Sequence, residues 1–349
     1  MRISTIKTST HEEVVRVEAA ECGLLGFIAI HSTRLGPAAG GLRMRPYPDE
    51  AAALEDVLRL SRGMTYKNAA AGLPLGGGKA VIIGDPAQLK SPALLAAFAQ
   101  AIEGLGGRYW TAEDMGMTPA DMAQVATATR FVAGLPDGPF ASGDPSPVTA
   151  RGIFNGIRTT ARHRFGAPDL AGRTVAVQGL GHVGENLCAL LHGDGARLVV
   201  ADIDAARTRA MAQRFGAAPA APDAILAAEA DILAPCAIGA ILNADSIPAL
   251  RVGAVAGGAN NQLATPEDGA RLHARGILYA PDFVINAGGI INAATEILRI
   301  TGREAWVADK LATLDATLDR ILARAARLSV SPNEVAEQIV DEQLAQQAA

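Results

Sequence analysis

The sequence predicts an α/β protein built from two domains. At 349 residues the chain is long enough to bury two separate hydrophobic cores. Segments with strand and helix patterns alternate in both halves, which is typical of α/β architecture. Between the halves, residues 134–147 contain three glycines and four prolines, too many for a helix or a central strand. We therefore predict a first domain over residues 1–135 and a second over residues 136–330.

The first domain is predicted to be a mixed α/β domain. A strand-rich stretch surrounds Cys22–His31, and the apolar run Ala80–Ile83 is typical of a buried strand. Helical spacing of apolar residues predicts one helix from about Asp49 to Tyr66 and an amphipathic helix near Pro92–Leu105.

The second domain is predicted to contain a parallel, nucleotide-binding sheet. After a helix that starts near Val148, the pattern is strand Thr174–Gln178, helix Val183–His192 and strand Arg197–Ala201. Toward the C-terminus an apolar helical stripe is followed by a capping-box pattern, Ser331-Pro332-Asn333-Glu334. Two helices are therefore expected at the end of the chain.

Composition favours a small-molecule ligand. The formal net charge is −5 without a basic stripe, which argues against nucleic acid or a membrane surface as a partner. No apolar run approaches the ~20 residues of a membrane span, and the N-terminus lacks a secretory signal pattern. Cys22, Cys188 and Cys236 lack metal-ligand spacing and are expected to be reduced packing residues, with no metal site. We expect a cytoplasmic protein.

The motif Gly179-Leu180-Gly181-His182-Val183-Gly184 predicts a dinucleotide site. It follows a predicted strand and opens a predicted helix, where bare backbone and the helix dipole favour a pyrophosphate. Asp202 ends the next strand, where a carboxylate accepts hydrogen bonds from an adenosine ribose and repels a 2′-phosphate. NAD is therefore predicted over NADP, with Arg207 and Arg209 expected on a solvated helix face. The alternative is a glycine motif that only packs the helix and binds no ligand. His182 lies inside the loop and is expected to be a spacer instead of a catalytic residue.

Met64–Ile83 contains two lysines on either side of a predicted turn that ends in three glycines. Lys67 closes an apparent helix and Lys79 opens an apolar strand, so both amines can face one cleft. Bare glycine backbone lets a small anion lie against its N–H groups. The alternative is a glycine-rich turn flanked by two solvated lysines.

Two further pairs of polar residues are candidates for chemistry. Glu113 and Asp114 follow a short apolar run, and one of them can serve as a proton-transfer group, or both can simply begin the following helix. Asn260 and Asn261 follow an apolar strand and a Gly-Gly turn, where their amides hold a substrate or ribose, or satisfy the turn.

Taken in order, these segments resemble the amino-acid dehydrogenases that act on leucine, valine, phenylalanine and glutamate. The matching motifs are LGPAAGGLRM (35–44), MTYKNAAAGLPLGGGK (64–79), RYWTAEDMG (108–116), PSPVTARG (145–152), VQGLGHVG (177–184), APCAIGA (234–240), GANNQL (258–263) and YAPDFVINAGGIIN (279–292). The resemblance implies reversible oxidative deamination of an L-amino acid with NAD, in a cleft between two domains that closes over the substrate. It also implies a homo-oligomer, with a last helix at about 331–349 that returns to the first domain.

The resemblance also implies roles in substrate chemistry. Lys67 would hold the substrate carboxylate, with help from the backbone at Gly40 and Gly41. Lys79 would activate the water that attacks the imine, and Asp114 would exchange protons with the substrate nitrogen. Hydride loss from Cα builds positive charge and water attack needs a base, so two lysines and a carboxylate suit the reaction.

Other roles follow from the same resemblance. Asn261 would contact the substrate amino group, Thr149 the nicotinamide amide and Asp202 the ribose. The remaining cofactor-binding residues implied are Gly179, Gly181, His182, Val183, Gly184, Cys236, Ala237 and Asn260.

The expected side-chain pocket is apolar. Its lining would be Ala39, Ala112, Ile290 and Ala293, which offer no cation for a second carboxylate, so an apolar pocket is favoured over a glutamate pocket. Enzymes similar to leucine dehydrogenase usually carry larger residues at Ala39 and Ala293, while Trp110 resembles the phenylalanine enzymes. A leucine, valine or isoleucine substrate is predicted, with phenylalanine as the alternative. A catalytically silent NAD-binding sensor is the alternative from another class; it would be expected to lose Lys67, Lys79 or Asp114.

Overall fold

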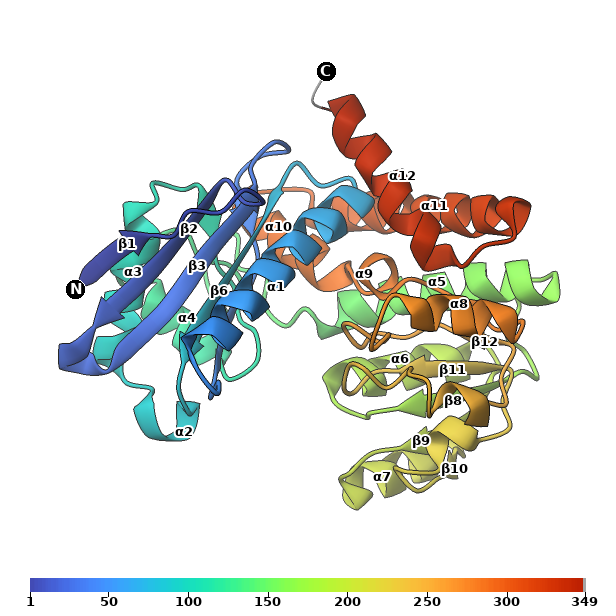
Figure 1. Ribbon diagram of the computed structural model, residues 1–349. Coiled ribbons are helices and arrows are strands. Elements are labelled where there is room, and N and C mark those ends of the chain that lie inside the picture. Colours follow the sequence, from blue (N-terminus) through green and yellow to red (C-terminus); the bar gives the residue numbers. More distant parts are fainter. Residues whose placement is uncertain (348–349) are drawn as a thin grey trace. The chain divides into compact units, whose positions relative to one another are not determined.

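The computed structural model describes residues 1–347 and divides the chain into two compact units (Figure 1). The first unit contains Met1–Pro145, Ile290–Val307 and the end of the chain from Glu342. The second unit contains Ser146–Gly289 and Ala308–Asp341. The boundary between Pro145 and Ser146 lies inside the loop rich in glycine and proline.

The first unit is built on a seven-stranded mixed sheet. Its strand order is β1 (Arg2–Thr5), β2 (Glu13–Ala19), β3 (Leu24–Ser32), β6 (Gly76–Ile83), β4 (Ala38–Ala39) and β7 (Tyr109–Trp110), and β5 (Leu42–Arg45) also pairs with β6. Neighbours from β1 to β6 are antiparallel, whereas β4 and β5 run parallel to β6. The mixed α/β prediction is confirmed. Strand β6 pairs with three other strands, β3, β4 and β5.

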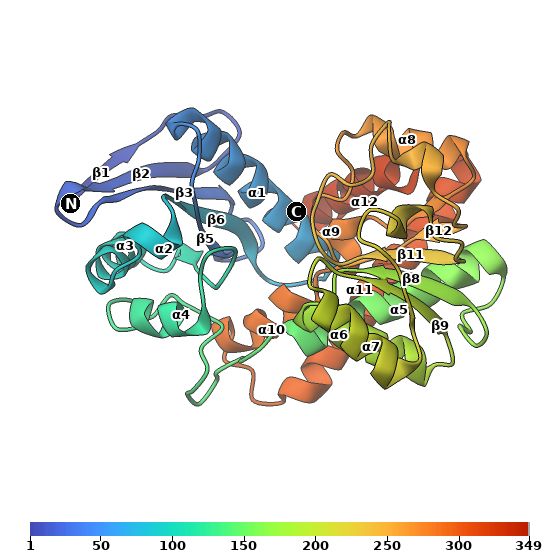
Figure 2. The same cartoon turned by 90° about the horizontal axis from the view of Figure 1, so that it is seen from below.

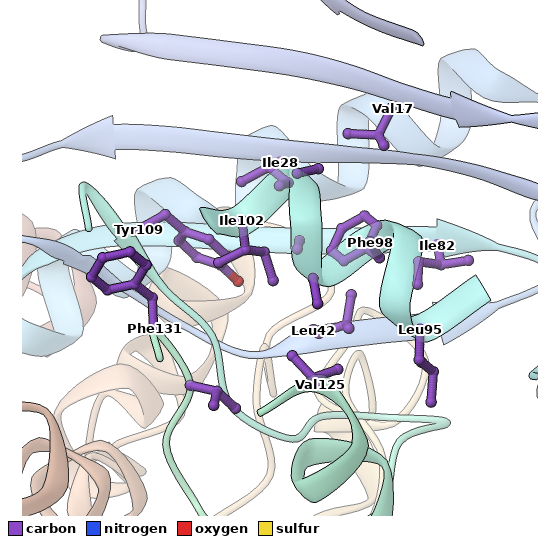
Figure 3. Packing of buried hydrophobic residues seen from close by; sticks show 14 of the residues in the cluster. Val17, Ile28, Leu42, Ile82, Leu95, Phe98, Ile102, Tyr109, Val125 and Phe131 are labelled. Carbon is purple, nitrogen blue, oxygen red and sulfur yellow. The ribbon is translucent and has the colours of Figure 1, made fainter. Parts of the chain in front are cut away.

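Helices cover both faces of this sheet. Helix α1 (Glu50–Ala70) lies on one face, and α3 (Pro92–Gly104) and α4 (Pro119–Val125) lie on the other, beside the short α2 (Pro86–Leu89) (Figure 2). Side chains alternate between the faces: Phe27 and Val81 pack with α1, whereas Ile28 and Ile82 pack with Phe98 of α3 (Figure 3). Asp49 caps α1 and Ser91 caps α3 through hydrogen bonds to backbone N–H groups.

Two details of the predicted lysine segment are wrong. Helix α1 continues to Ala70 instead of ending near Tyr66, and Gly76–Gly78 are the start of β6, not part of the turn. The turn itself contains Gly72, whose φ of 60° favours glycine. A Cβ on Gly77 would lie 2.1 Å from Thr65 Oγ1, and one on Gly78 would lie 2.6 Å from the Tyr109 ring. The glycines therefore let α1 and β7 pack closely against the strand.

Residues 136–145 and 290–307 differ from the division expected from sequence. Helix α10 (Gly288–Ile297) starts in the second unit, but its buried Glu296 accepts the Gly134 N–H at 2.8 Å and the Ser142 hydroxyl at 2.9 Å. Arg303 and Asn292 also donate to the Ser142 carbonyl. These long-range contacts assign residues 136–145 and 290–307 to the first unit.

The second unit is built on a six-stranded sheet in which every pair is parallel. The strand order is β10 (Ala218–Pro219), β9 (Arg197–Ala201), β8 (Thr174–Gln178), β11 (Ile232–Pro235), β12 (Ala254–Val255) and β13 (Leu278–Tyr279). The predicted parallel sheet is confirmed, and β8 and β9 have the predicted bounds. Connecting helices are α5 (Ser146–Phe165), α6 (His182–Gly193), α7 (Ala205–Phe215), α8 (Glu267–Ala274) and α9 (Asp282–Ile285).

The two predicted terminal helices are present as α11 (Arg303–Leu328) and α12 (Pro332–Gln347). The start of α12 packs on α8, because a Cβ on Gly269 would lie 1.8 Å from Asn333 Oδ1. The return to the first domain that was expected for 331–349 is therefore limited to the part from Glu342, and residues 348–349 lie outside the described residues. Within residues 1–347, no helix is both long and apolar enough to span a membrane.

The tight contact at Gly77 can be tested by unfolding. Gly77→Ala should lower the free energy of unfolding by about 1–3 kcal/mol, because the new methyl group overpacks α1 against β6. Gly63→Ala is the control on α1, the helix that Gly77 contacts, at a position where a Cβ meets nothing within 4 Å; it should raise stability by up to ~1 kcal/mol through helix propensity. Urea unfolding measures both. Equal effects of the two substitutions would contradict the packing role of Gly77.

Candidate active site

Lys79 and Asp114 form an ion pair at the centre of the first unit's sheet. Lys79 lies on β6 opposite Ala29 of β3, and its side chain is 7% exposed. Its ammonium donates a hydrogen bond to Oδ2 of Asp114, whose side chain is 21% exposed. The other carboxylate oxygen, Oδ1, accepts the N–H of Met115 at 2.5 Å. The structure thus brings together the two residues predicted to carry the chemistry.

The acid pair does not begin the next helix. Helix α4 starts at Pro119, and its capping box is formed by Thr118 and Asp121. Glu113 instead lies in an isolated parallel bridge with Leu42, and the Leu42 N–H donates to the Ala112 carbonyl at 2.7 Å. The alternative interpretation of Glu113 and Asp114 as helix-starting acids is therefore wrong.

The two glycines before β5 make room for this arrangement. A Cβ on Gly41 would lie 2.8 Å from the Asp114 Cβ, and one on Gly40 would lie 1.9 Å from the Gly78 carbonyl oxygen. The Gly40 N–H donates to the Trp110 carbonyl at 3.1 Å and is engaged within the sheet. The missing side chain at Gly40 therefore lets the Gly78 backbone pack directly against it. The hydroxyl of buried Tyr109 donates to the Gly40 carbonyl at 2.7 Å and holds the loop in place.

Arg43 is a site residue that sequence reasoning missed. Its guanidinium lies 3.5 Å from Asp114 Oδ1 and 3.1 Å from Asp56 Oδ2. On β5, Leu42 and Met44 are in the core against α3, so the alternation of the strand directs Arg43 to the face covered by α1. The LGPAAGGLRM motif contains this arginine, and the alternation is the signal that could have identified it.

The electrostatics of the site keep Asp114 ionised. Burial alone would raise the pKa of the Asp114 carboxyl, but the charges of Lys79 and Arg43 outweigh it. Together with hydrogen bonds from Lys79 and Met115, they hold the pKa well below its ordinary value. At neutral pH the carboxyl is therefore an anion with two cationic neighbours.

Lys67 lies in the last turn of α1 and is half-buried. Thr65 of the same turn packs against Gly77 of β6, so this part of the helix lies close to the strand that carries Lys79. Among the four pocket candidates, Ala39 is buried in the sheet beside Gly77 and Trp110, and Ala112 follows β7. Ile290 and Ala293 lie on α10, in the part of that helix that belongs to the first unit.

A cavity of about 660 Å³ opens at the carboxyl ends of β8, β9 and β11 in the second unit. Such strand ends are where ligands bind in open parallel sheets. The predicted cofactor residues that line this cavity are Gly179, Gly181, Asp202, Cys236 and Ala237. His182, Val183 and Gly184 form the first turn of α6, directly after this loop. Thr149 lies in the first turn of α5, and Asn260 and Asn261 follow β12.

The glycine loop fits a dinucleotide pyrophosphate. Gly179 has a φ of 90°, and a Cβ on Gly184 would lie 2.0 Å from the Gly179 carbonyl oxygen, so both positions require glycine. A Cβ on Gly181 would meet no atom closer than Arg207 at 4.0 Å, which leaves open space at the N-terminus of α6. Buried Gln178 Oε1, which lines the same cavity, has no hydrogen-bond partner within residues 1–347. The alternative of a purely structural glycine motif does not account for this open space at the N-terminus of α6.

Asp202 and Arg207 both have contacts beyond those predicted from the sequence. Asp202 accepts the Leu180 N–H at 2.6 Å and the Asp204 N–H at 2.8 Å, so it also orders the glycine loop. Arg207 is exposed on α7 (Ala205–Phe215), as predicted, and it also lines the cavity and lies 3.6 Å from Asp204. Arg209 is exposed, as predicted.

Other candidate residues have structural partners. The Asn260 side-chain oxygen accepts the Asn286 amide at 2.8 Å, and Asn261 adopts the left-handed backbone conformation with a φ of 52°. Burial raises the pKa of the Cys236 thiol to about 11 and that of Cys188 to about 12, which keeps both protonated. Among residues 1–347, no His, Cys, Asp and Glu side chains gather into a metal-binding group.

The fold and site define a two-unit α/β dehydrogenase with a Rossmann-type dinucleotide-binding unit. The chain belongs to the Glu/Leu/Phe/Val dehydrogenase family. Residues 11–131 match the model of the Glu/Leu/Phe/Val dehydrogenase dimerisation domain, and residues 202–338 match that of glutamate/leucine/phenylalanine/valine dehydrogenase. The resemblance and fold class inferred from the sequence motifs are thereby confirmed.

Individual relatives span nearly the whole chain. A leucine dehydrogenase of Geobacillus stearothermophilus is 45% identical over 97% of this chain and 92% of its own length. A phenylalanine dehydrogenase of Caldalkalibacillus thermarum is 44% identical over 97% of this chain and 93% of its own. The crystal structure of L-tryptophan dehydrogenase from Nostoc punctiforme superposes with a TM-score of 0.84 at 39% identity, covering 97% of both chains.

Proposed function

We propose that this protein catalyses the reversible oxidative deamination of an apolar L-amino acid with NAD. The products are the 2-oxo acid, ammonium and NADH. The ion pair between Lys79 of β6 and Asp114 after β7 is the observation that carries this proposal, because it supplies a proton acceptor beside a cation in a family of amino-acid dehydrogenases. A silent NAD-binding sensor would have no need to bury these two charges at an energetic cost.

The roles of the polar residues follow from their charge and placement. Lys67 pairs with the substrate carboxylate beside the bare backbone of Gly40 and Gly41. Asp114, ionised at neutral pH, accepts a proton from the substrate nitrogen, and Lys79 orients the water that attacks the imine carbon. Asn261 contacts the substrate amino group. Together these groups neutralise the carboxylate, remove the proton and stabilise the developing oxygen.

The second unit holds the cofactor. NAD, when bound, supplies the hydride acceptor for the substrate Cα. Gly179, Gly181 and Gly184 leave the α6 N-terminus open to the pyrophosphate, with His182 and Val183 in the same turn. Asp202 receives the ribose. The other residues that we assign to the cofactor are Thr149, Cys236, Ala237 and Asn260.

The choice of NAD over NADP rests on the charges around the cavity. Among the described residues, Asp202, Asp204 and Asp223 line it, against a single lining cation, Arg207. Arg207 is also partly neutralised by Asp204 at 3.6 Å. An adenosine 2′-phosphate would therefore meet like charges.

The side chain of the substrate is proposed to be of the leucine, valine or isoleucine type. Ala39, Ala112, Ile290 and Ala293 are apolar and carry no charge that could pair with a second carboxylate. Phenylalanine is the second candidate, because two of these residues are alanines where leucine enzymes usually carry larger groups, and a phenylalanine dehydrogenase is 44% identical. We also propose a homo-oligomer, supported by the dimerisation-domain match over residues 11–131, and a cytoplasmic location.

The function is tested by a panel of L-amino acids assayed for NADH and NADPH formation. Leucine, valine and isoleucine with NAD should give the highest kcat/KM, and glutamate should give essentially none. Asp114→Asn should lower kcat by ~10²-fold or more, the usual effect of losing a positioned proton-transfer group. Asp137→Asn, at an exposed aspartate of the same unit, is the matched control. Near-normal turnover by Asp114→Asn, or no turnover of any amino acid by the wild type, would refute the proposal.

The pocket assignment is tested by Ala39→Leu. The added side chain should shift kcat/KM from phenylalanine toward valine, with discrimination changing by ~1–3 kcal/mol for each methylene lost from the pocket. The ratio of phenylalanine to valine kcat/KM measures the effect, with NAD held saturating. An unchanged ratio in a folded variant would mean that Ala39 does not line the pocket.

A further inference from the structure

The site extends beyond the Lys79–Asp114 pair into a chain of alternating charges. Arg43 of β5 lies between two carboxylates, Asp114 at 3.5 Å and Asp56 of α1 at 3.1 Å. Asp56 in turn accepts hydrogen bonds from the Tyr47 hydroxyl at 2.8 Å and from Arg59 at 2.9 Å. The sequence of charges from β6 to α1 is therefore positive, negative, positive, negative and positive.

The inner members of this chain are protected from solvent. The Arg43 side chain is 12% exposed and that of Asp56 is 13% exposed, whereas the terminal Arg59 is 54% exposed. Arg43 Nε is buried and has no hydrogen-bond partner within residues 1–347. A surface ion pair contributes little, but opposite charges at these distances and this burial interact strongly. The guanidinium is thus held by its two carboxylate contacts.

The two cations contact different oxygens of Asp114. Lys79 binds Oδ2, while Arg43 lies on the side of Oδ1 together with the Met115 N–H. If Lys79 turns toward a substrate or water, Arg43 and Met115 still hold the carboxylate in place. A carboxylate with a fixed plane can accept a proton from a positioned nitrogen without first reorienting.

We propose that Arg43 is a positioning residue that orients Asp114 for proton exchange, and that Asp56 controls how strongly the Arg43 charge acts on Asp114. This rests on the proposed function, in which Asp114 exchanges a proton with the substrate. Asp56 partly neutralises Arg43, so it leaves Asp114 more basic than an unpaired arginine would. Tyr47 holds Asp56 in position for that task.

The direction of each effect follows from the groups around Asp114. Lys79 of β6, Arg43 of β5 and Tyr109 of β7 face the carboxylate. Asp56 and Tyr47 face Arg43, and Arg59 contacts Asp56. Removing the Arg43 charge raises the pKa of Asp114, because one stabilising cation is lost. Removing the Asp56 charge has the opposite effect and lowers the pKa of Asp114 below its value in the wild type, because Arg43 is no longer partly neutralised. Substitutions at Arg43 and at its partner Asp56 should therefore shift the pKa of Asp114 in opposite directions.

The test compares Arg43→Gln, Arg43→Lys and Asp56→Asn in the full chain. Isotope-edited infrared titration of [4-¹³C]aspartate-labelled protein, with the Asp114 band identified by its loss in Asp114→Asn, should show Asp114 titrating about one pH unit higher in Arg43→Gln. Asp56→Asn should shift it in the opposite direction. Arg43→Lys keeps the charge and should restore a titration close to that of the wild type. Arg108→Gln, which breaks an exposed ion pair with Glu13, is the matched control.

Steady-state kinetics provide the second measurement. Arg43→Gln should lower kcat by ~10-fold with little change in amino-acid KM, and the acid limb of kcat/KM against pH should follow the infrared shifts. An Asp114 band that titrates identically in Arg43→Gln, Asp56→Asn and the wild type would overturn the proposal, as would shifts of both variants in one direction. The infrared titration needs no substrate. A wild type without amino-acid oxidation would refute the proposed function alone.

Discussion

The buried ion pair between Lys79 and Asp114 is the interaction on which the rest of the site depends. Burying two charges is costly, and a structure retains such a pair when geometry and further hydrogen bonds compensate. Here Gly41 leaves room for the Asp114 side chain, Met115 donates its N–H, and Arg43 supplies a second cation. The glycines at the start of β6 let α1 approach the same strand. These contacts in the first unit accommodate and orient the Lys79–Asp114 pair.

Where tertiary packing agrees with local pattern, the sequence was sufficient to predict the fold. Strands Thr174–Gln178 and Arg197–Ala201 are continuous apolar runs in a parallel sheet, and their bounds are correct. Gly76–Gly78 were predicted as part of a turn because glycine often marks a turn. The structure shows that Gly77 and Gly78 make room for Thr65 and Tyr109, which are distant in sequence, so no local pattern could indicate this packing role. The placement of residues 290–307 similarly depends on Glu296 binding a loop about 160 residues earlier.

In the site, too, residues within a recognisable motif could be predicted, whereas residues whose role depends on long-range contacts could not. Lys79 and Asp114 could be predicted because both lie in motifs with a chemical reason for their residue types, and the structure joins them. Arg43 was missed because its importance depends on the register of β5 beside β6, which pairs it with Val81 and directs it toward α1. The exposed position of Arg207 was predicted, but its place in the cavity lining was not, because loops after β10 and β11 form part of that lining and no local pattern predicts this. A single sequence does not show which strands pair or which distant segments contact one another, and these contacts determine the roles of the residues that were missed.

A double-mutant cycle on Lys79 and Asp114 tests the central interaction most directly. The free energy of unfolding of the full chain would be measured for the wild type, Lys79→Met, Asp114→Asn and the double variant. If the pair is coupled as the structure indicates, the double variant loses less stability than the sum of the two single losses, with an interaction energy of about 0.5–3 kcal/mol. Losses that add to within ~0.3 kcal/mol would contradict a buried, coupled ion pair at the centre of the site.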